Sequence, residues 1–121
     1  MDDGQITIGE RSGVAIIALS GEHDLSTATA VGDAVRAHGN GALVVDLVQT
    51  TFLDSSILGV LVAASRGAGE NGTQFSVVLP TDARSPVRRI FDLTGLDSAV
   101  PHGFDVDAAI EAGRKGAAPT A

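Results

Sequence analysis

The chain has 121 residues and a formal net charge of −7, and hydrophobic residues make up 44% of it. This composition predicts one folded domain with its own core and excludes an intrinsically disordered chain. The excess of acidic residues argues against nucleic-acid binding, which needs clustered lysine and arginine, and the absence of cysteine excludes disulfides and cysteine-bearing zinc sites.

The hydrophobic pattern and the positions of turn residues predict alternating strands and helices. Apolar side chains recur every second residue in some segments and every third or fourth residue in others. Ser85 followed by Pro86 is the clearest helix start, because serine caps the first turn and proline suits its first position. In the first third of the chain we expect strands over 5–10 and 14–19, a polar connection over 21–24, and a helix from Ser26 or Thr27 to about His38. A strand over 42–47, a loop over 48–53 and a helix that begins at 54–56 and fades at 67–69 follow. The last part is expected to contain a strand over 75–79, a helix from Pro86 to a stop at Thr94-Gly95, a short edge strand over 99–100, and a last helix that Asp105 caps.

The order of these elements defines the fold class. An N-terminal hairpin followed by a βαβαβ core predicts an α/β domain with a mixed sheet covered by helices. No linker or internal repeat divides the chain, so we expect a single domain over 1–121, with an ordered core over about 5–113 and a flexible tail over 114–121. The longest apolar stretch, 57–64, is too short to span a membrane, and residues 1–4 lack the apolar core of a signal peptide. The expected location is the cytoplasm.

Asp54, Ser55 and Ser56 form the motif with the most chemical meaning. They follow a buried strand and precede a helix, whose first amides lack intrahelical acceptors and attract anions. A phosphate on Ser55 or Ser56 would gain those amides as donors and would add about −1.5 to −2 charges to a small surface. The alternative is that Asp54 or Ser55 only caps the helix.

Other arrangements do not support an enzyme or a cofactor. The Glu22-His23-Asp24 run has no partner at metal-ligand spacing, and we expect it to be a polar surface loop. Asp46 ends a buried strand as a phosphoacceptor does in receiver domains, but the only lysine is Lys115 in the tail. No nucleophile elbow or phosphate-binding glycine loop is present. Arg88 and Arg89 are expected on a solvated helix face, where such a pair can also anchor an acidic partner.

Four segments in the right order resemble the STAS domains of anti-sigma factor antagonists. They read LSGEHDL over 19–25, VVDL over 44–47, FLDSSILGVL over 52–61 and VRRIFDLTGL over 87–96. The resemblance covers most of residues 5–110. It implies a STAS fold, with a mixed four- to five-stranded sheet and helices packed mainly on one side, and no catalytic activity.

The resemblance also implies a phosphorylation switch. The phosphorylated residue would be Ser55, with Ser56 as second choice, and the kinase would be a cognate anti-sigma factor with a histidine-kinase-like ATPase fold. The unphosphorylated protein would bind that kinase and free the sigma factor, and a PP2C-type phosphatase would reset it. The expected partner-binding residues are Asp24, Asp54, Ser55, Ser56, Ile57 and Leu58, with no cofactor, nucleic acid or membrane involved and a monomer as the expected state.

One residue departs from the family pattern. The family usually has glycine after Asp-Ser-Ser, where this chain has Ile57. A branched side chain is compatible with a helix, but here it is expected to add bulk where kinase and partner approach. The alternative function is therefore that of a divergent, non-phosphorylated STAS adaptor in a stress-signalling or transport complex.

Overall fold

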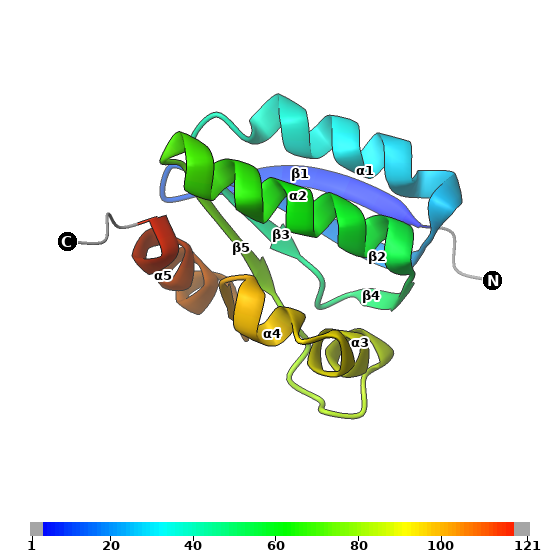
Figure 1. The fold of residues 1–121 in the computed structure, drawn as a ribbon. Coiled ribbons are helices and arrows are strands. Elements are labelled where there is room, and N and C mark those ends of the chain that lie inside the picture. Colours follow the sequence, from blue (N-terminus) through cyan, green and yellow to red (C-terminus); the bar gives the residue numbers. More distant parts are fainter. Residues whose placement is uncertain (1–3, 118–121) are drawn as a thin grey trace.

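The structure is a computed structural model, and it describes residues 4–117. These residues form six strands and five helices (Figure 1). In chain order they are β1 (Gln5–Arg11), β2 (Val14–His23), α1 (Leu25–His38), β3 (Ala42–Asp46), β4 (Thr50–Leu53), α2 (Ser55–Asn71), β5 (Gln74–Val78), α3 (Pro86–Thr94), α4 (Leu96–Ala99), β6 (His102–Gly103) and α5 (Val106–Ala117).

The sheet is mixed, as predicted, and one long strand organises it. Its strand order is β1-β2-β3-β5-β6, with β1 antiparallel to β2 and the remaining pairs parallel. The ten-residue β2 pairs with β3 along its first part and with β4 along its last part. Two short strands, β4 and β6, bring the sheet to six strands instead of the expected four or five.

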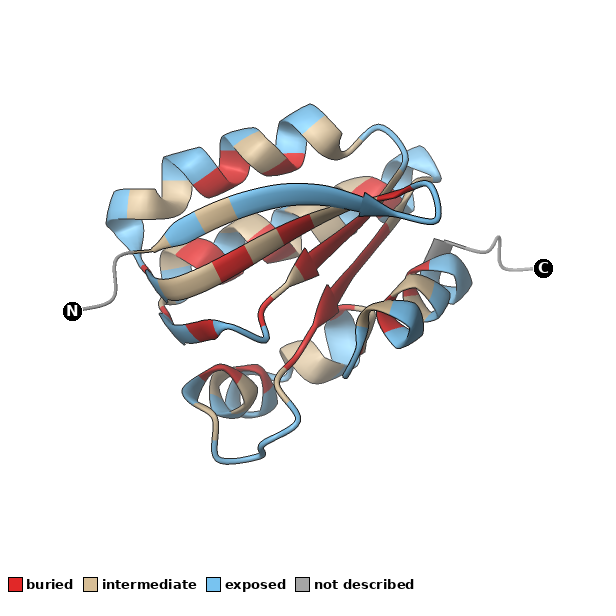
Figure 2. Ribbon diagram, turned by 180° about the vertical axis from the view of Figure 1, so that it is seen from behind, coloured by how far each residue is buried: buried red, intermediate tan, exposed pale blue. Residues whose placement is uncertain are grey.

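Helices α1 to α4 contribute to the larger core on one face of the sheet, and α5 covers the other face. The larger core joins strand residues such as Ile17, Val45 and Val77 to side chains of α1, α2 and α3. The neighbouring strand residues Val44 and Val78 point the opposite way and pack with α5. The central strands are accordingly buried along most of their length, whereas β1 is largely exposed at the sheet edge (Figure 2). The predicted arrangement, with helices mainly on one side, is confirmed.

The predicted start and end of α3 and the predicted cap of α5 are confirmed. The Ser85 hydroxyl accepts hydrogen bonds from the backbone of the first turn of α3, Pro86 occupies its first position, and Gly95 ends it at a φ of 76°. Asp105 accepts a hydrogen bond from the Ala108 amide at the start of α5. At these positions the determining contacts lie within a few residues of one another in the sequence.

Two boundaries near the middle of the chain were predicted wrongly. Strand β2 continues through His23, so Asp24 caps α1, not Ser26 or Thr27. The expected loop over 48–53 contains strand β4, which pairs with the end of β2. Both errors have the same cause, because the extension of β2 and the formation of β4 depend on their mutual pairing.

The second half also differs at several boundaries. Helix α2 does not fade at 67–69 but runs to Asn71, where Gly72 ends it at a φ of 71°. The segment expected as an edge strand, 99–100, follows the short helix α4, and the strand comes after Pro101. Residues 114–117 of the expected tail belong to α5, and 118–121 lie outside the described residues.

Arg88 is not part of a solvated face. Its Nη1 donates to the carbonyl oxygens of Pro80 and Thr81, at 3.2 Å in each case. Its guanidinium also lies 4.7 Å from the ring centroid of Phe104. Arg88 therefore holds the connection between β5 and α3, and Arg89 is the exposed member of the pair.

No helix within residues 4–117 combines the length and the apolar character that crossing a membrane would require.

Candidate functional site

The site lies where two parallel strands end at the same level. His23, the last residue of β2, is paired with Leu53, the last residue of β4. The next residue along each strand is an aspartate, Asp24 or Asp54, and each aspartate caps a helix. The register of the β2–β4 pair thus places the starts of α1 and α2 side by side, as the right side of Figure 1 shows.

The two helix starts are built in the same way. Asp24 Oδ1 accepts from the Ser26 amide at 2.9 Å and from the Ser26 hydroxyl. Asp54 Oδ1 accepts from the Ser56 amide at 3.0 Å and from the Ser56 hydroxyl. In both motifs the residue between aspartate and serine is the first of the helix, and it is exposed: Leu25 in α1 and Ser55 in α2.

The ionised form of Asp54 is stabilised by groups at the starts of both helices. The hydroxyl of Ser56 is the largest cause that holds the pKa of Asp54 below its usual range, and the amides of Ile57, Ser56 and Leu25 act in the same direction. The Leu25 amide belongs to the first residue of α1, so groups from both helix starts contribute to the lowered pKa of Asp54. We call the surface formed by Asp24, Leu25, Asp54 and Ser55 the two-helix corner.

Asp24 has a similar environment. Hydrogen bonds from the hydroxyl and the amide of Ser26 lower the pKa of Asp24, while burial and the charge of Asp54 oppose that shift. The repulsion from Asp54 means that the two carboxylates are close enough to interact. Both are ionised at neutral pH, which makes the corner acidic.

The two adjacent serines differ in their availability. Ser56 donates its hydroxyl to Asp54 and is only partly exposed. Ser55 is exposed, and among residues 4–117 its hydroxyl has no hydrogen-bond partner. Since a hydroxyl must be reachable to be modified, the geometry favours Ser55 over Ser56.

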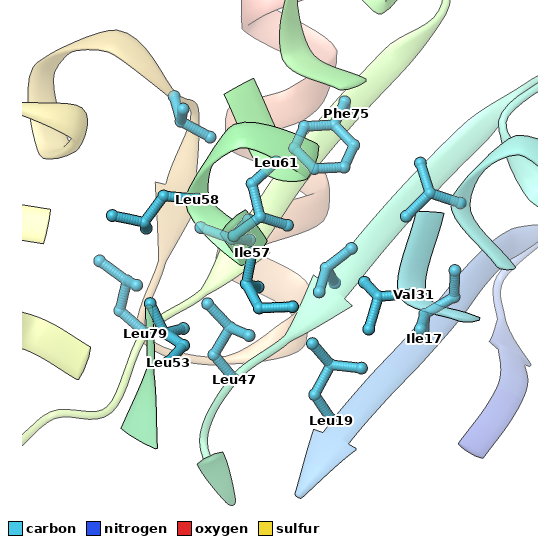
Figure 3. Packing of buried hydrophobic residues seen from close by; sticks show 14 of the residues in the cluster. Ile17, Leu19, Val31, Leu47, Leu53, Ile57, Leu58, Leu61, Phe75 and Leu79 are labelled. Atoms are coloured by element: carbon cyan, nitrogen blue, oxygen red, sulfur yellow. The ribbon is translucent and has the colours of Figure 1, made fainter. Parts of the chain in front are cut away.

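The structure buries Ile57 and Leu58, two of the expected contact residues. Their side chains are 0% and 7% exposed and belong to the main core. In Figure 3 the Ile57 side chain points toward Leu47 and lies among the other core side chains. The bulk of Ile57 therefore fills the interior and does not obstruct the approach of a partner to Ser55.

The predicted polar loop over 22–24 is also wrong, because His23 is completely buried at the end of β2. Its Nε2 lies 3.0 Å from the Ser20 carbonyl oxygen and 3.2 Å from that of Gln5, and both oxygens only accept. Nε2 therefore carries a proton, and Nδ1 lies 3.0 Å from the Thr27 hydroxyl of α1. His23 thereby fixes the end of β2 against β1 and α1. In the part of the chain that the structure describes, no three metal-ligating side chains converge.

The lowered pKa values of Asp24 and Asp54 predict acid sensitivity. A carboxylate whose folded pKa lies below its unfolded value stabilises the fold fully above the unfolded pKa, and that stabilisation is lost as the pH falls through the folded pKa. We expect the stability to decrease below about pH 4, and Asp54→Asn to reduce this decrease because asparagine caps a helix without a charge. Urea unfolding between neutral and acidic pH measures it; equal acid sensitivity in both proteins would contradict the role of Asp54.

The sheet order and the N-terminal hairpin define a STAS-fold domain, and comparisons with known proteins agree. The family model described as "Mlab, STAS domain" matches residues 6–101. The anti-sigma-F factor antagonist RsfB of Mycobacterium tuberculosis is 40% identical over 96 residues, which are 76% of this chain and 75% of RsfB. The chain belongs to the STAS-domain family of anti-sigma factor antagonists.

Solved structures of anti-sigma factor antagonists have the same fold as this chain. The crystal structure of an anti-sigma factor antagonist from Mycobacterium paratuberculosis has a TM-score of 0.78 and 36% identity, and the alignment covers 93% of this chain and 96% of that one. The Bacillus cell fate determinant SpoIIAA in its phosphorylated form has a TM-score of 0.62 at 18% identity, with 90% and 97% of the two chains covered. The second similarity concerns the fold alone.

Proposed function

We propose that this protein is a cytoplasmic anti-sigma factor antagonist that is switched at Ser55. With Ser55 unphosphorylated it binds an anti-sigma factor, which then releases its sigma factor. The anti-sigma factor is also the serine kinase, with a histidine-kinase-like ATPase fold, and phosphorylation of Ser55 ends the complex. A PP2C-type phosphatase restores the binding form.

The observation that carries this proposal is the exposed Ser55 hydroxyl at the start of α2, which has no hydrogen-bond partner among residues 4–117. The helix start favours a phosphate, because its amides and its dipole stabilise negative charge. Family membership and the similarity to RsfB support an anti-sigma factor as the partner.

The release mechanism follows from the charges at the two-helix corner. Asp24 and Asp54 already make this surface acidic, and a phosphate on Ser55 adds about −1.5 to −2 charges beside them. A partner surface that fits a neutral hydroxyl would have to desolvate this group without a matching cation, which is unfavourable. The bound state is therefore lost when Ser55 is modified.

The alternative function, that of a non-phosphorylated adaptor, was motivated by the bulk of Ile57. Because that side chain is buried, it adds no bulk to the surface around Ser55, and this reason for the adaptor role no longer applies. The adaptor role is nevertheless a distinct outcome of the experiment that tests the proposal.

The test is affinity capture from the native lysate with three baits: the wild-type protein, Ser55→Ala and Ser55→Asp. We expect the wild type and Ser55→Ala to retain an anti-sigma factor with an ATPase domain, and Ser55→Asp to retain much less of it. Ser56→Ala is the matched control and should behave as the wild type. Capture of one transport or stress-signalling complex by all the baits would contradict the switch and indicate the adaptor role.

A further inference from the structure

An unusually exposed apolar side chain lies at the two-helix corner. Leu25 is 75% exposed, although it is the first residue of a helix whose other face is buried in the core. Among residues 4–117 only five other large apolar side chains are exposed, and these are Ile8, Val48, Phe52, Leu93 and Phe104. Leu25 contributes almost nothing to folding in this position, since it covers little of the core.

The position of Leu25 relative to Ser55 is determined by the backbone. Leu25 and Ser55 are the first residues of α1 and α2, which begin after the paired ends of β2 and β4. The Leu25 amide also helps to lower the pKa of Asp54, the residue directly before Ser55. We therefore expect a partner that reaches the Ser55 hydroxyl to meet the Leu25 side chain as well.

The charges around Leu25 are negative. Asp24 and Asp54 adjoin it, and Glu22 is exposed at the end of β2. Between residues 12 and 65 the only arginine or lysine is Arg36, which lies in the last turn of α1 and is paired with Asp33. An apolar group within an acidic surface suits a partner that offers an apolar pocket with a basic rim.

We propose that Leu25 is the apolar anchor of the interface with the anti-sigma factor, where it enters a pocket bordered by lysine or arginine side chains. The proposal rests on the proposed function and assigns the apolar contact to Leu25, because Ile57 and Leu58 are buried and cannot supply it. A few side chains near the centre of an interface, packed in desolvated pockets, carry most of the binding free energy. In the complex the basic rim pairs with Asp24 and Asp54, so a phosphate on Ser55 would find no free cation there and would bring water to the same pocket.

The test measures the affinity for the purified anti-sigma factor that the capture experiment identifies. We expect Leu25→Ala to weaken binding about tenfold or more, mainly through faster dissociation. Leu25→Met should restore most of the affinity because it keeps the apolar volume. The matched control is Ile8→Ala, an exposed apolar residue of the edge strand β1 that is paired with Ile17, away from the strand ends at the corner.

The variants are all at exposed positions, and thermal unfolding verifies that they fold. If Leu25→Ala binds as the wild type does while Ser55→Asp has lost affinity, the anchor is refuted and the switch at Ser55 stands. If Ser55→Asp also binds as the wild type does, the proposed function fails and the anchor fails with it. If Leu25→Ala and Ser55→Asp both lose affinity while Leu25→Met keeps most of it, the result supports both the anchor at Leu25 and the switch at Ser55.

Discussion

Replacing Ile57 by glycine is expected to lower the free energy of unfolding by about 3–5 kcal/mol. The side chain is fully buried in the main core near Leu47 and Leu61 (Figure 3). Its removal would leave a cavity, and glycine would also weaken the first turn of α2. Since small domains are stable by only about 5–15 kcal/mol, this is a severe loss.

The control for this prediction is Ile57→Val, which keeps most of the side chain and should destabilise by only about 1 kcal/mol. Urea unfolding of the three proteins measures the differences. We expect the folded fraction of Ile57→Gly to bind the anti-sigma factor normally, because this side chain does not reach the surface. A stable Ile57→Gly protein with altered binding would contradict its assignment to the core.

Phosphorylation of Ser55 is expected to lower the affinity for the anti-sigma factor by about a hundredfold or more, because like charges and an unmatched phosphate at an interface are strongly unfavourable. The phosphate would lie next to Asp54 and close to Asp24, with no arginine or lysine of this chain nearby in sequence to neutralise it. Ser55→Asp adds less charge than a phosphate and should reproduce only part of the loss.

Ser56 provides the control for this second prediction. Its hydroxyl is bonded to Asp54, so Ser56→Ala should remain a substrate for the kinase, whereas Ser55→Ala should accept no phosphate. Phosphate incorporation into Ser55→Ala at the wild-type level would show that the modified residue had been assigned wrongly.

Helix ends could be predicted from the sequence where they depend on contacts between residues that are close together in the chain. The cap at Ser85, the stop at Gly95 and the cap at Asp105 each involve contacts within a few residues, and all three are present. The apolar run over 42–47 likewise predicts a buried strand, because burial on both faces leaves a continuous apolar signal. The motif order was also enough to identify the family and its fold.

The remaining features depend on contacts that a linear pattern does not display. Strand β4 exists because it pairs with the end of β2, about thirty residues earlier in the chain, and that pairing is also what aligns Asp24 with Asp54. The helical period of α2 did not reveal that Ile57 faces the core. Leu25 was missed as a contact residue because its exposure is known only once the direction of α1 is known.

The central claim is that one phosphate on Ser55 separates this protein from its anti-sigma factor. The most direct measurement is a calorimetric titration of the anti-sigma factor with the same chain before and after complete phosphorylation, with the modified residue located by mass spectrometry. The account predicts tight binding before modification, phosphate on Ser55 alone, and an affinity lower by about a hundredfold or more afterwards. Equal affinity before and after, or loss of binding with the phosphate on another residue, would contradict it.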